Sequence, residues 1–376
     1  MIYLDNAATS YPKPVSVLKS AALALRRFSF NSGRGGYRES VKAAEKIYEV
    51  REQIGDMFGF LPQNVIFTKN CTEALNIAIR GSVKKDGHII ISSLEHNSVS
   101  RVVQALSDCG IADYDVAKYD IDPNKCLSNF REKIQGNTVA IVCMHSSNVF
   151  GVKMPLREIG MLCREWGIRF IVDAAQGAGA DRIHTADIPI DILCAPGHKG
   201  LFGPMGTGFL SVRDGITLTP LMYGGTGSQS LNLRQPSSMP DRLEAGTLNN
   251  GGILALGEGL QFINTVGTKH ILAHELELCG YLYERMTDIT GIKLYTPVPD
   301  GVSVMPMISF NFGNLSSEAI AAELADRGIC VRAGYHCSPL AHRHFHTTDT
   351  GTVRISPGYF NTKRDCDEFL NVLKKL

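Results

Sequence analysis

Lys199 and Asp173 are the residues whose chemistry is most readily stated from the sequence. Lys199 follows an apolar run at residues 190–195, and Asp173 follows another at residues 168–172. Each side chain is therefore expected where a strand ends. An amine and a carboxylate so placed suit pyridoxal 5'-phosphate (PLP), which needs a Schiff-base lysine and an acidic partner for its ring nitrogen. Gln176 could then donate to the phenolic oxygen of that ring, whereas the simpler interpretation of Asp173 is a helix N-cap.

A second group of polar residues lies where a helix should begin. Cys71 and Thr72 follow the apolar run at residues 65–67. Free backbone N–H groups and a hydroxyl at a helix start form an anion site, although Thr is also an ordinary N-cap residue. His198, directly before Lys199, could add a donor to the same phosphate.

His96 and Asn148 follow two further apolar runs, at residues 88–92 and 139–144. The imidazole of His96 could stack on a planar ring, but a histidine at a strand end is usually a surface or hydrogen-bonded residue. Asn148 is either a polar contact to a ligand or a turn former.

Cys337 lies in a polar loop between Arg332 and a histidine-rich stretch. Nearby cations lower the pKa of a thiol and favour the nucleophilic thiolate. Arg354, at the start of another short apolar run, has the geometry to hold a substrate carboxylate through two hydrogen bonds.

Two other interpretations of these motifs are weaker. His342, His344 and His346 alternate and, with Cys337, would suit one face of a strand near a metal, but no second ligand group with characteristic spacing is present. The glycines at 200, 203 and 206 lack the GxGxxG order of a dinucleotide loop.

Composition places the chain among globular proteins without a charge bias. The 376 residues are 44% hydrophobic and 20% charged, with a formal charge of +1. We therefore expect no nucleic-acid partner. The chain has no apolar run of membrane-spanning length and no signal peptide, so a cytoplasmic location is expected. The ten cysteines are scattered without a CxxC, which favours reduced thiols.

Apolar runs alternate with helix-length segments between about residues 65 and 215. Such alternation predicts an α/β fold with a mainly parallel sheet between helices, whose ligands bind beyond the carboxyl ends of the strands. Residues 217–250 read as an irregular loop region. The segment after 250 indicates a smaller α+β domain. We expect a large domain at residues 15–250 and a small domain made of 1–14 and 251–376.

Taken together, these motifs resemble the class V aminotransferase family of fold-type I PLP enzymes, and within it the cysteine desulfurase and selenocysteine lyase branch. The resemblance runs from residues 3–9, Tyr-Leu-Asp-Asn-Ala-Ala-Thr, to residues 354–362, Arg-Ile-Ser-Pro-Gly-Tyr-Phe-Asn-Thr. It implies the PLP-transferase fold, with a seven-stranded sheet in the large domain, and a homodimer with active sites at the interface.

The resemblance also implies roles for individual residues. For the cofactor, it implies that Lys199 binds PLP covalently, that His96 stacks on the ring and that Asp173 and Gln176 contact its polar atoms. The phosphate contacts that it implies are Thr72, His198 and, from the neighbouring subunit, Thr247. For the substrate it implies Asn148, Arg354, Arg332 and Arg34, with Cys337 as the sulfur acceptor.

Pro196 departs from the family pattern, which usually has a Ser or Thr hydroxyl for the phosphate at this position. Proline offers neither a hydroxyl nor a backbone N–H. Phosphate anchoring is therefore expected to shift to Cys71, Thr72 and Thr247, or to be weaker.

The function expected from these residues is PLP-dependent removal of sulfur from L-cysteine, which leaves L-alanine and a persulfide on Cys337. Lys199 would move the Cα proton. The alternatives are selenocysteine lyase activity, another class V reaction such as transamination or epimerisation, and a non-enzymatic sulfur carrier. A protein that accepts the sulfur is an expected partner, because the loop bearing Cys337 is short.

Overall fold

The computed structural model describes residues 1–33 and 35–376, and a seven-stranded sheet forms its centre. The strand order is β2-β8-β7-β6-β5-β3-β4. All neighbouring strands are parallel except β8, which runs antiparallel to β2 and β7. The bounds are β2 Val65–Thr68, β3 Gly87–Ser92, β4 Ala112–Ala117, β5 Thr138–Met144, β6 Arg169–Asp173, β7 Ile192–Pro196 and β8 Gly208–Val212.

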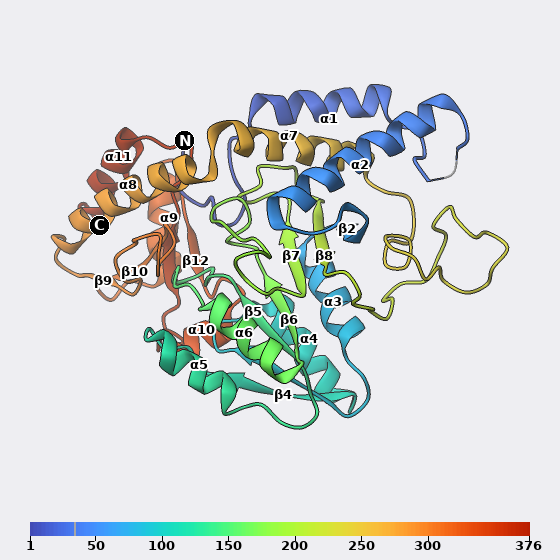
Figure 1. Cartoon of the computed structure of the whole chain (residues 1–376). Coiled ribbons are helices and arrows are strands. Elements are labelled where there is room, and N and C mark those ends of the chain that lie inside the picture. The colour runs from blue at the N-terminus through green and yellow to red at the C-terminus, as the bar shows by residue number, and fades with distance from the viewer. Residues whose placement is uncertain (34) are drawn as a thin grey trace.

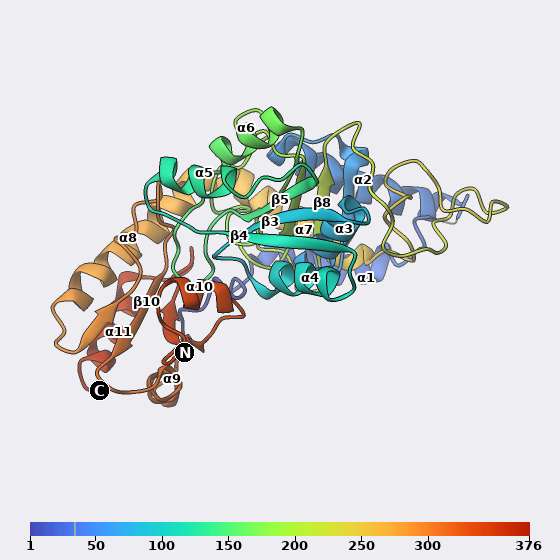
Figure 2. The same ribbon diagram turned by 90° about the horizontal axis from the view of Figure 1, so that it is seen from below.

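Both faces of this sheet are covered by helices, as Figures 1 and 2 show. Side chains alternate along β5: Ile141 and Cys143 pack into one core cluster, and Ala140 and Val142 pack into the other. This alternation follows from the two-residue period of a strand. The second cluster takes residues from α3 (Cys71–Ser82) and α4 (Asn97–Asp108).

The first core cluster is closed by helices on the opposite face. They are α2 (Arg38–Phe58), α5 (Pro123–Arg131), α6 (Leu156–Trp166) and α7 (Asn250–Val266). A further helix, α1 (Val15–Arg27), lies beside α7. A short 3-10 turn, η1 (Pro62–Asn64), leads into β2. The predicted mainly parallel sheet between helices is confirmed.

The C-terminal part and the first residues of the chain form a smaller α+β unit. Its antiparallel sheet has the order β12-β13-β10-β9, and β1 pairs with β11 in parallel beside it. The strands are β1 Ile2–Tyr3, β9 Ile292–Leu294, β10 Ile308–Phe312, β11 Ile329–Cys330, β12 Arg332–Gly334 and β13 Thr352–Ile355. The helices are α8 Thr268–Thr287, α9 Ser317–Asp326, α10 Pro339–His344 and α11 Lys363–Leu373.

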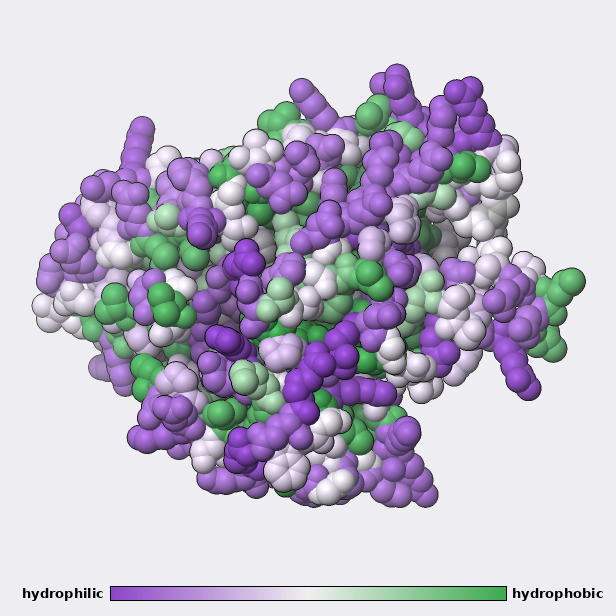
Figure 3. All heavy atoms as spheres, in the orientation of Figure 1, coloured by the Kyte–Doolittle hydropathy of each residue, from purple (hydrophilic) through white to green (hydrophobic). Residues whose placement is uncertain are grey.

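Residues 213–249 contain no helix or strand, as expected for residues 217–250 from their composition. Part of this segment projects from the large sheet, at the right of Figure 1 in yellow. Leu231 and Leu233 are fully exposed, and Figure 3 shows apolar atoms at the tip of the projection. In the described part of the chain, no helix is long and apolar enough to cross a membrane.

Candidate active site

A cavity of about 160 Å³ lies at the carboxyl ends of the parallel strands. Its walls come from the segments that follow β2, β3, β5, β6 and β7, which explains why residues so far apart in sequence meet there. The residues that line it are Asn70, Cys71, Thr72, His96, Ser98, Met144, Ser146, Asn148, Asp173, Ala175, Gln176, Pro196, His198 and Lys199. Eight of these are residues that the sequence analysis assigns to a cofactor or substrate.

Lys199 lies three residues beyond β7, and burial lowers the pKa of its amine to about 8. The N-terminal segment holds the loop that carries it. The carbonyl oxygen of His198 accepts hydrogen bonds from Thr9 Oγ1 at 2.9 Å, from Ser10 N at 3.1 Å and from Lys13 Nζ at 2.7 Å. Ser10 Oγ also donates to the carbonyl of Lys199 at 3.0 Å. The loop is therefore fixed from outside the sheet.

Asp173 is the last residue of β6 and is buried. Its Oδ1 accepts the backbone N–H of Ala175 at 2.9 Å and the thiol of Cys71 at 3.5 Å. Burial raises the pKa of this carboxyl, although these hydrogen bonds and nearby Lys199 oppose the shift. Cys71, expected to help anchor a phosphate, thus directs its thiol to Asp173 instead. No helix begins at Asp173, so its alternative interpretation as an N-cap does not apply.

The start of α3 supplies the anion-binding end of the cavity. Asn70, rather than a threonine, is the N-cap, since its side chain accepts the N–H of Glu73 at 2.9 Å. Thr72 is exposed at the cavity wall. His198 Nδ1 is buried and has no hydrogen-bond partner among the described residues. Burial lowers the pKa of His198 to about 4. A neutral imidazole there has one ring nitrogen free for a ligand.

His96 caps the N-terminus of α4. Its Nδ1 accepts the backbone N–H of Ser98 at 3.0 Å, and burial together with nearby Lys199 lowers its pKa to about 4. The ring is neutral at pH 7 and has a fixed orientation at the cavity wall. Both properties suit stacking on a flat ligand.

Asn148 and Arg354 contact each other at the boundary of the two sheets. Arg354 Nη1 donates to the Asn148 carbonyl at 2.6 Å, and Nη2 forms an ion pair with Asp5 at 2.5 Å. Asn148 also donates from Nδ2 to the His336 carbonyl at 2.8 Å. Asn148 lines the cavity, whereas Arg354 is 1% exposed and does not. In this structure the guanidinium is held by a carboxylate of the chain itself.

Cys337 is exposed in the short loop between β12 and α10. Arg332 Nη2 lies 3.8 Å from the Cys337 sulfur. The Cys337 carbonyl accepts a hydrogen bond from the backbone N–H of Asn97 at 2.7 Å. That hydrogen bond places the loop beside the residue that follows His96. The thiol does not line the cavity, but its loop is packed against the cavity's wall.

The remaining expected residues do not line this cavity or are not described. Thr247 lies away from this cavity, at two surface hollows beside α2 and β2. Arg34 is outside the described residues. His342 and His344 lie on α10, a helix, where alternate residues do not share a face as they would on a strand. Among the described residues, no group of three ligating side chains could hold a metal.

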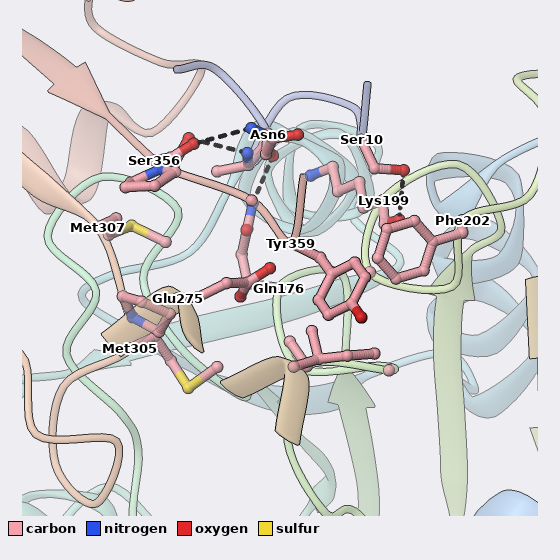
Figure 4. Close-up of a pocket in the computed structure, with 18 of the residues that line it drawn as sticks. Asn6, Ser10, Gln176, Lys199, Phe202, Glu275, Met305, Met307, Ser356 and Tyr359 are labelled. Atoms are coloured by element: carbon pink, nitrogen blue, oxygen red, sulfur yellow. Dashed lines mark hydrogen bonds between the residues drawn. The ribbon is translucent and has the colours of Figure 1, made fainter. Parts of the chain in front are cut away.

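A second cavity, of about 60 Å³, shares Lys199, Gln176 and Ala175 with the first. Figure 4 shows Lys199 and Asn6 on one side of it and Glu275 with Met305 on another. Gln176 donates from Nε2 to the Ala7 carbonyl at 3.1 Å. Burial raises the pKa of Glu275 to about 8, so this carboxyl is largely protonated at pH 7. Lys199 therefore lines both cavities.

Sequence reasoning missed several residues around these cavities. The run Asp5-Asn6-Ala7 is part of the family resemblance, but nothing in the sequence shows that Asp5 meets Arg354. Lys13 belongs to no motif in the sequence. Ser146 lies two residues beyond the predicted strand at 139–144, which is the one signal that places it at the cavity.

Comparison with known proteins gives the same assignment along the whole chain. The chain matches the family Aminotransferase class-V over residues 2–369. A probable cysteine desulfurase of Methanothermobacter thermautotrophicus is 32% identical over 97% of this chain and 92% of the relative. One from Pyrococcus abyssi is 32% identical over 100% of this chain and 94% of the relative. An apo cysteine desulfurase structure from Thermococcus onnurineus has a TM-score of 0.92 at 30% identity, covering 100% of this chain and 94% of that one. The protein belongs to the class V aminotransferase family.

Proposed function

We propose that the protein is a PLP-dependent cysteine desulfurase. The observation that carries this proposal is the convergence of Lys199, Asp173 and His96 on one cavity, with the loop of Cys337 hydrogen-bonded to its wall. The similar proteins named cysteine desulfurases support it.

The residues of the cavity fit PLP. The buried, unpartnered Nδ1 of His198 and the N-terminus of α3 are donors suited to a phosphate. Asp173 suits a protonated ring nitrogen, whose charge would compensate the burial of the carboxylate. His96 would stack on the ring and Lys199 would bind it covalently. Pro196 lines the cavity without a hydroxyl. Phosphate binding would therefore depend on Thr72, His198 and the backbone of α3, together with Thr247 from a second copy.

When bound, PLP withdraws electrons and so stabilises negative charge at the substrate Cα. Lys199 Nζ takes the Cα proton, and Asp173 holds the proton of the ring nitrogen. Asn148 contacts the substrate in the cavity, and Arg354 orients the substrate carboxylate once that carboxylate replaces Asp5. The Cys337 thiolate then attacks the substrate sulfur: a S–S bond forms and the C–S bond breaks. The electron pair of that bond stays on carbon, which takes up a proton and becomes the methyl group of alanine.

Cys337→Ala tests the proposed function. The wild type should convert L-cysteine to L-alanine with a persulfide on Cys337, and the variant should lose most alanine formation while it keeps the yellow colour of the bound cofactor. Alanine is quantified by chromatography and the persulfide by mass spectrometry. Unchanged alanine output would remove Cys337 as the acceptor. Parallel reactions with L-selenocysteine, in which selenium leaves more readily, decide whether a lyase reaction dominates.

The exposed position of Cys337 supports transfer of its sulfur to a second molecule, either an acceptor protein or a free thiol. We also propose a homodimer, in which Thr247, a residue that does not line the cavity of its own chain, would contact the phosphate in the cavity of the second copy. A cytoplasmic location remains part of the proposal.

A further inference from the structure

A chain of hydrogen bonds leads from the cavity into the large domain. Ser146 Oγ lies 3.2 Å from His145 Nδ1, and His145 Nε2 lies 3.0 Å from Asp181 Oδ2. Lys153 Nζ completes the chain at 2.5 Å from the same carboxylate oxygen. Ser146 lines the cavity that contains Lys199, and the function described above uses none of the other three residues.

The absence of a side chain at Gly177 leaves the space that the His145 ring occupies. His145 is 3% exposed and follows β5, and its backbone N–H donates to the Asp173 carbonyl at 2.8 Å. Its ring lies against Gly177, where a Cβ would come within 2.5 Å of the imidazole. A side chain at position 177 would therefore displace the ring. The chain of contacts depends on a glycine next to Gln176.

The direction of each hydrogen bond can be deduced. Burial opposes ionisation of Asp181, but the hydrogen bonds from His145 and Lys153 hold its pKa below the usual value. An ionised carboxylate only accepts, so His145 Nε2 must carry a hydrogen. Burial lowers the pKa of His145, and Asp181 and Lys153 are the charged groups facing it. The neutral ring leaves Nδ1 as an acceptor, so the Ser146 hydroxyl donates to it.

Ser146 consequently presents only lone pairs to the cavity. We propose that Ser146, oriented by His145 and Asp181, accepts one proton from the ammonium group of an amino acid that enters the cavity. This inference rests on the proposed function for the class of ligand. In the same hydroxyl–imidazole–carboxylate order, the imidazole of nucleophilic serine enzymes takes the hydroxyl proton. Here the hydroxyl would replace that proton with one from the ammonium group.

The proton taken up in this step is returned within one turnover. An N–H bond of the ammonium breaks as the Ser146 hydroxyl takes the proton, and the original hydroxyl proton moves to His145 Nδ1. The resulting imidazolium is transient because burial disfavours it, Asp181 lowers its energy, and no oxidation or reduction occurs. When product alanine leaves as an ammonium, the proton returns by the same path. Ser146 touches the ligand, whereas His145 and Asp181 are positioning residues.

The chain offers a matched control at the other end of the same strand, β5. His88 Nδ1 lies 2.9 Å from Thr138 Oγ1, and His88 Nε2 lies 3.5 Å from Asp115 Oδ2. Thr138 begins β5 and Ser146 follows its end, so the two hydroxyls are separated by about 20 Å of strand. Thr138→Val removes a hydroxyl from a similar arrangement that touches no cavity residue.

The first test compares pH profiles of kcat/KM for L-cysteine in the wild type, Ser146→Ala and Thr138→Val. For Ser146→Ala we expect a loss of about a hundredfold at pH 7. The acidic limb of its profile should move to higher pH. At high pH, where the ammonium group of free L-cysteine has already lost its proton to solvent, the rate of Ser146→Ala should approach that of the wild type. Thr138→Val should match the wild type throughout. A deficit in Ser146→Ala that is constant with pH, or no deficit, would overturn the proposal.

The second test does not depend on turnover. In ¹⁵N-histidine NMR spectra of the PLP-loaded protein, His145 is assigned from the signal lost in His145→Gln. We expect the Nε2–H tautomer at pH 7 and a shift of the His145 Nδ1 resonance when L-alanine is added. Ser146→Ala should keep the tautomer but show no such shift. An Nδ1–H tautomer, or no response of the wild type to L-alanine, would contradict the inference. A wild type that makes no alanine from L-cysteine would contradict only the proposed function.

Discussion

Lys199 combines a buried amine with a position between two cavities. Its pKa is lowered to about 8 by burial, with Asp173 opposing the shift. Near neutral pH a useful fraction of the amine is therefore unprotonated. Only the unprotonated amine can attack the aldehyde of PLP.

The rate of cofactor uptake should follow this ionisation. Apo protein mixed with PLP is expected to gain its yellow absorbance faster as pH rises, with a midpoint near 8. Lys199→Ala should show no such absorbance at any pH. Stopped-flow absorbance measures the rate, and a rate that is flat between pH 6.5 and 9 would contradict the lowered pKa.

Glu275 gives a second pH effect, on stability. Burial raises the pKa of its carboxyl from 4.5 to about 8, partly offset by a hydrogen bond from the Tyr359 backbone. The folded state therefore binds this proton more tightly than the unfolded state, and stability falls as pH rises from about 4.5 to 8. Glu275→Gln should raise the melting temperature at pH 8–9 and leave it nearly unchanged at pH 4. Equal shifts at both pH values would argue against this account.

At the scale of elements, residues 9–13 hold the loop that carries Lys199 in place, and we call this segment the clamp. Three side chains between residues 9 and 13 donate to the carbonyls of His198 and Lys199. Lys13 is the charged member, and burial lowers its pKa to about 8. The segment joins the first residues of the small unit to the loop after β7.

Lys13→Met should therefore loosen that loop. A hydrogen bond from a charged donor contributes about 1.5–3 kcal/mol, and we expect a loss of this size in the free energy of unfolding. PLP should also dissociate faster. Lys46→Met, which removes an exposed ion pair with Glu49, is the matched control and should change stability by less than about 1 kcal/mol. Denaturant unfolding and absorbance decay report the two effects, and equal behaviour of both variants would reject the clamp.

Local patterns predicted most elements of the large sheet, because buried parallel strands are continuous apolar runs. The edge strand β4 was not among them, since Asp113 and Asp115 interrupt its pattern and its middle is only partly buried. The cavity residues that follow strands were predictable for the same reason. The Asp5–Arg354 pair was not, because 349 residues separate its partners. The His145–Asp181 contact likewise depends on the turn after β6 and on Gly177.

At the scale of the whole molecule, the position of Thr247 bears on whether the protein forms a homodimer. It does not line the cavity of its own chain, so a contact with PLP phosphate requires a second copy. The exposed leucines of the projecting segment lie in the same irregular region, residues 213–249. Both observations agree with the proposed homodimer.

Mixed dimers test this arrangement. Lys199→Ala and Thr247→Ala are each expected to impair both sites of a homodimer. In a mixed dimer, the Lys199→Ala subunit supplies Thr247 to a cavity that retains Lys199, which restores one complete site. Alanine production should therefore rise when the two variants are unfolded and refolded together. Activity no greater than the sum of the separate variants would place Thr247 outside the partner's site.

The ion pair between Asp5 and Arg354 has a consequence for affinity. Asp5 is tethered to the same chain, so it acts as a built-in competitor at high local concentration for any incoming carboxylate. The measured dissociation constant of a substrate then reports an exchange of one anion for another, rather than the filling of an empty guanidinium. The strength of the exchange is set as much by the first residues of the chain as by the substrate.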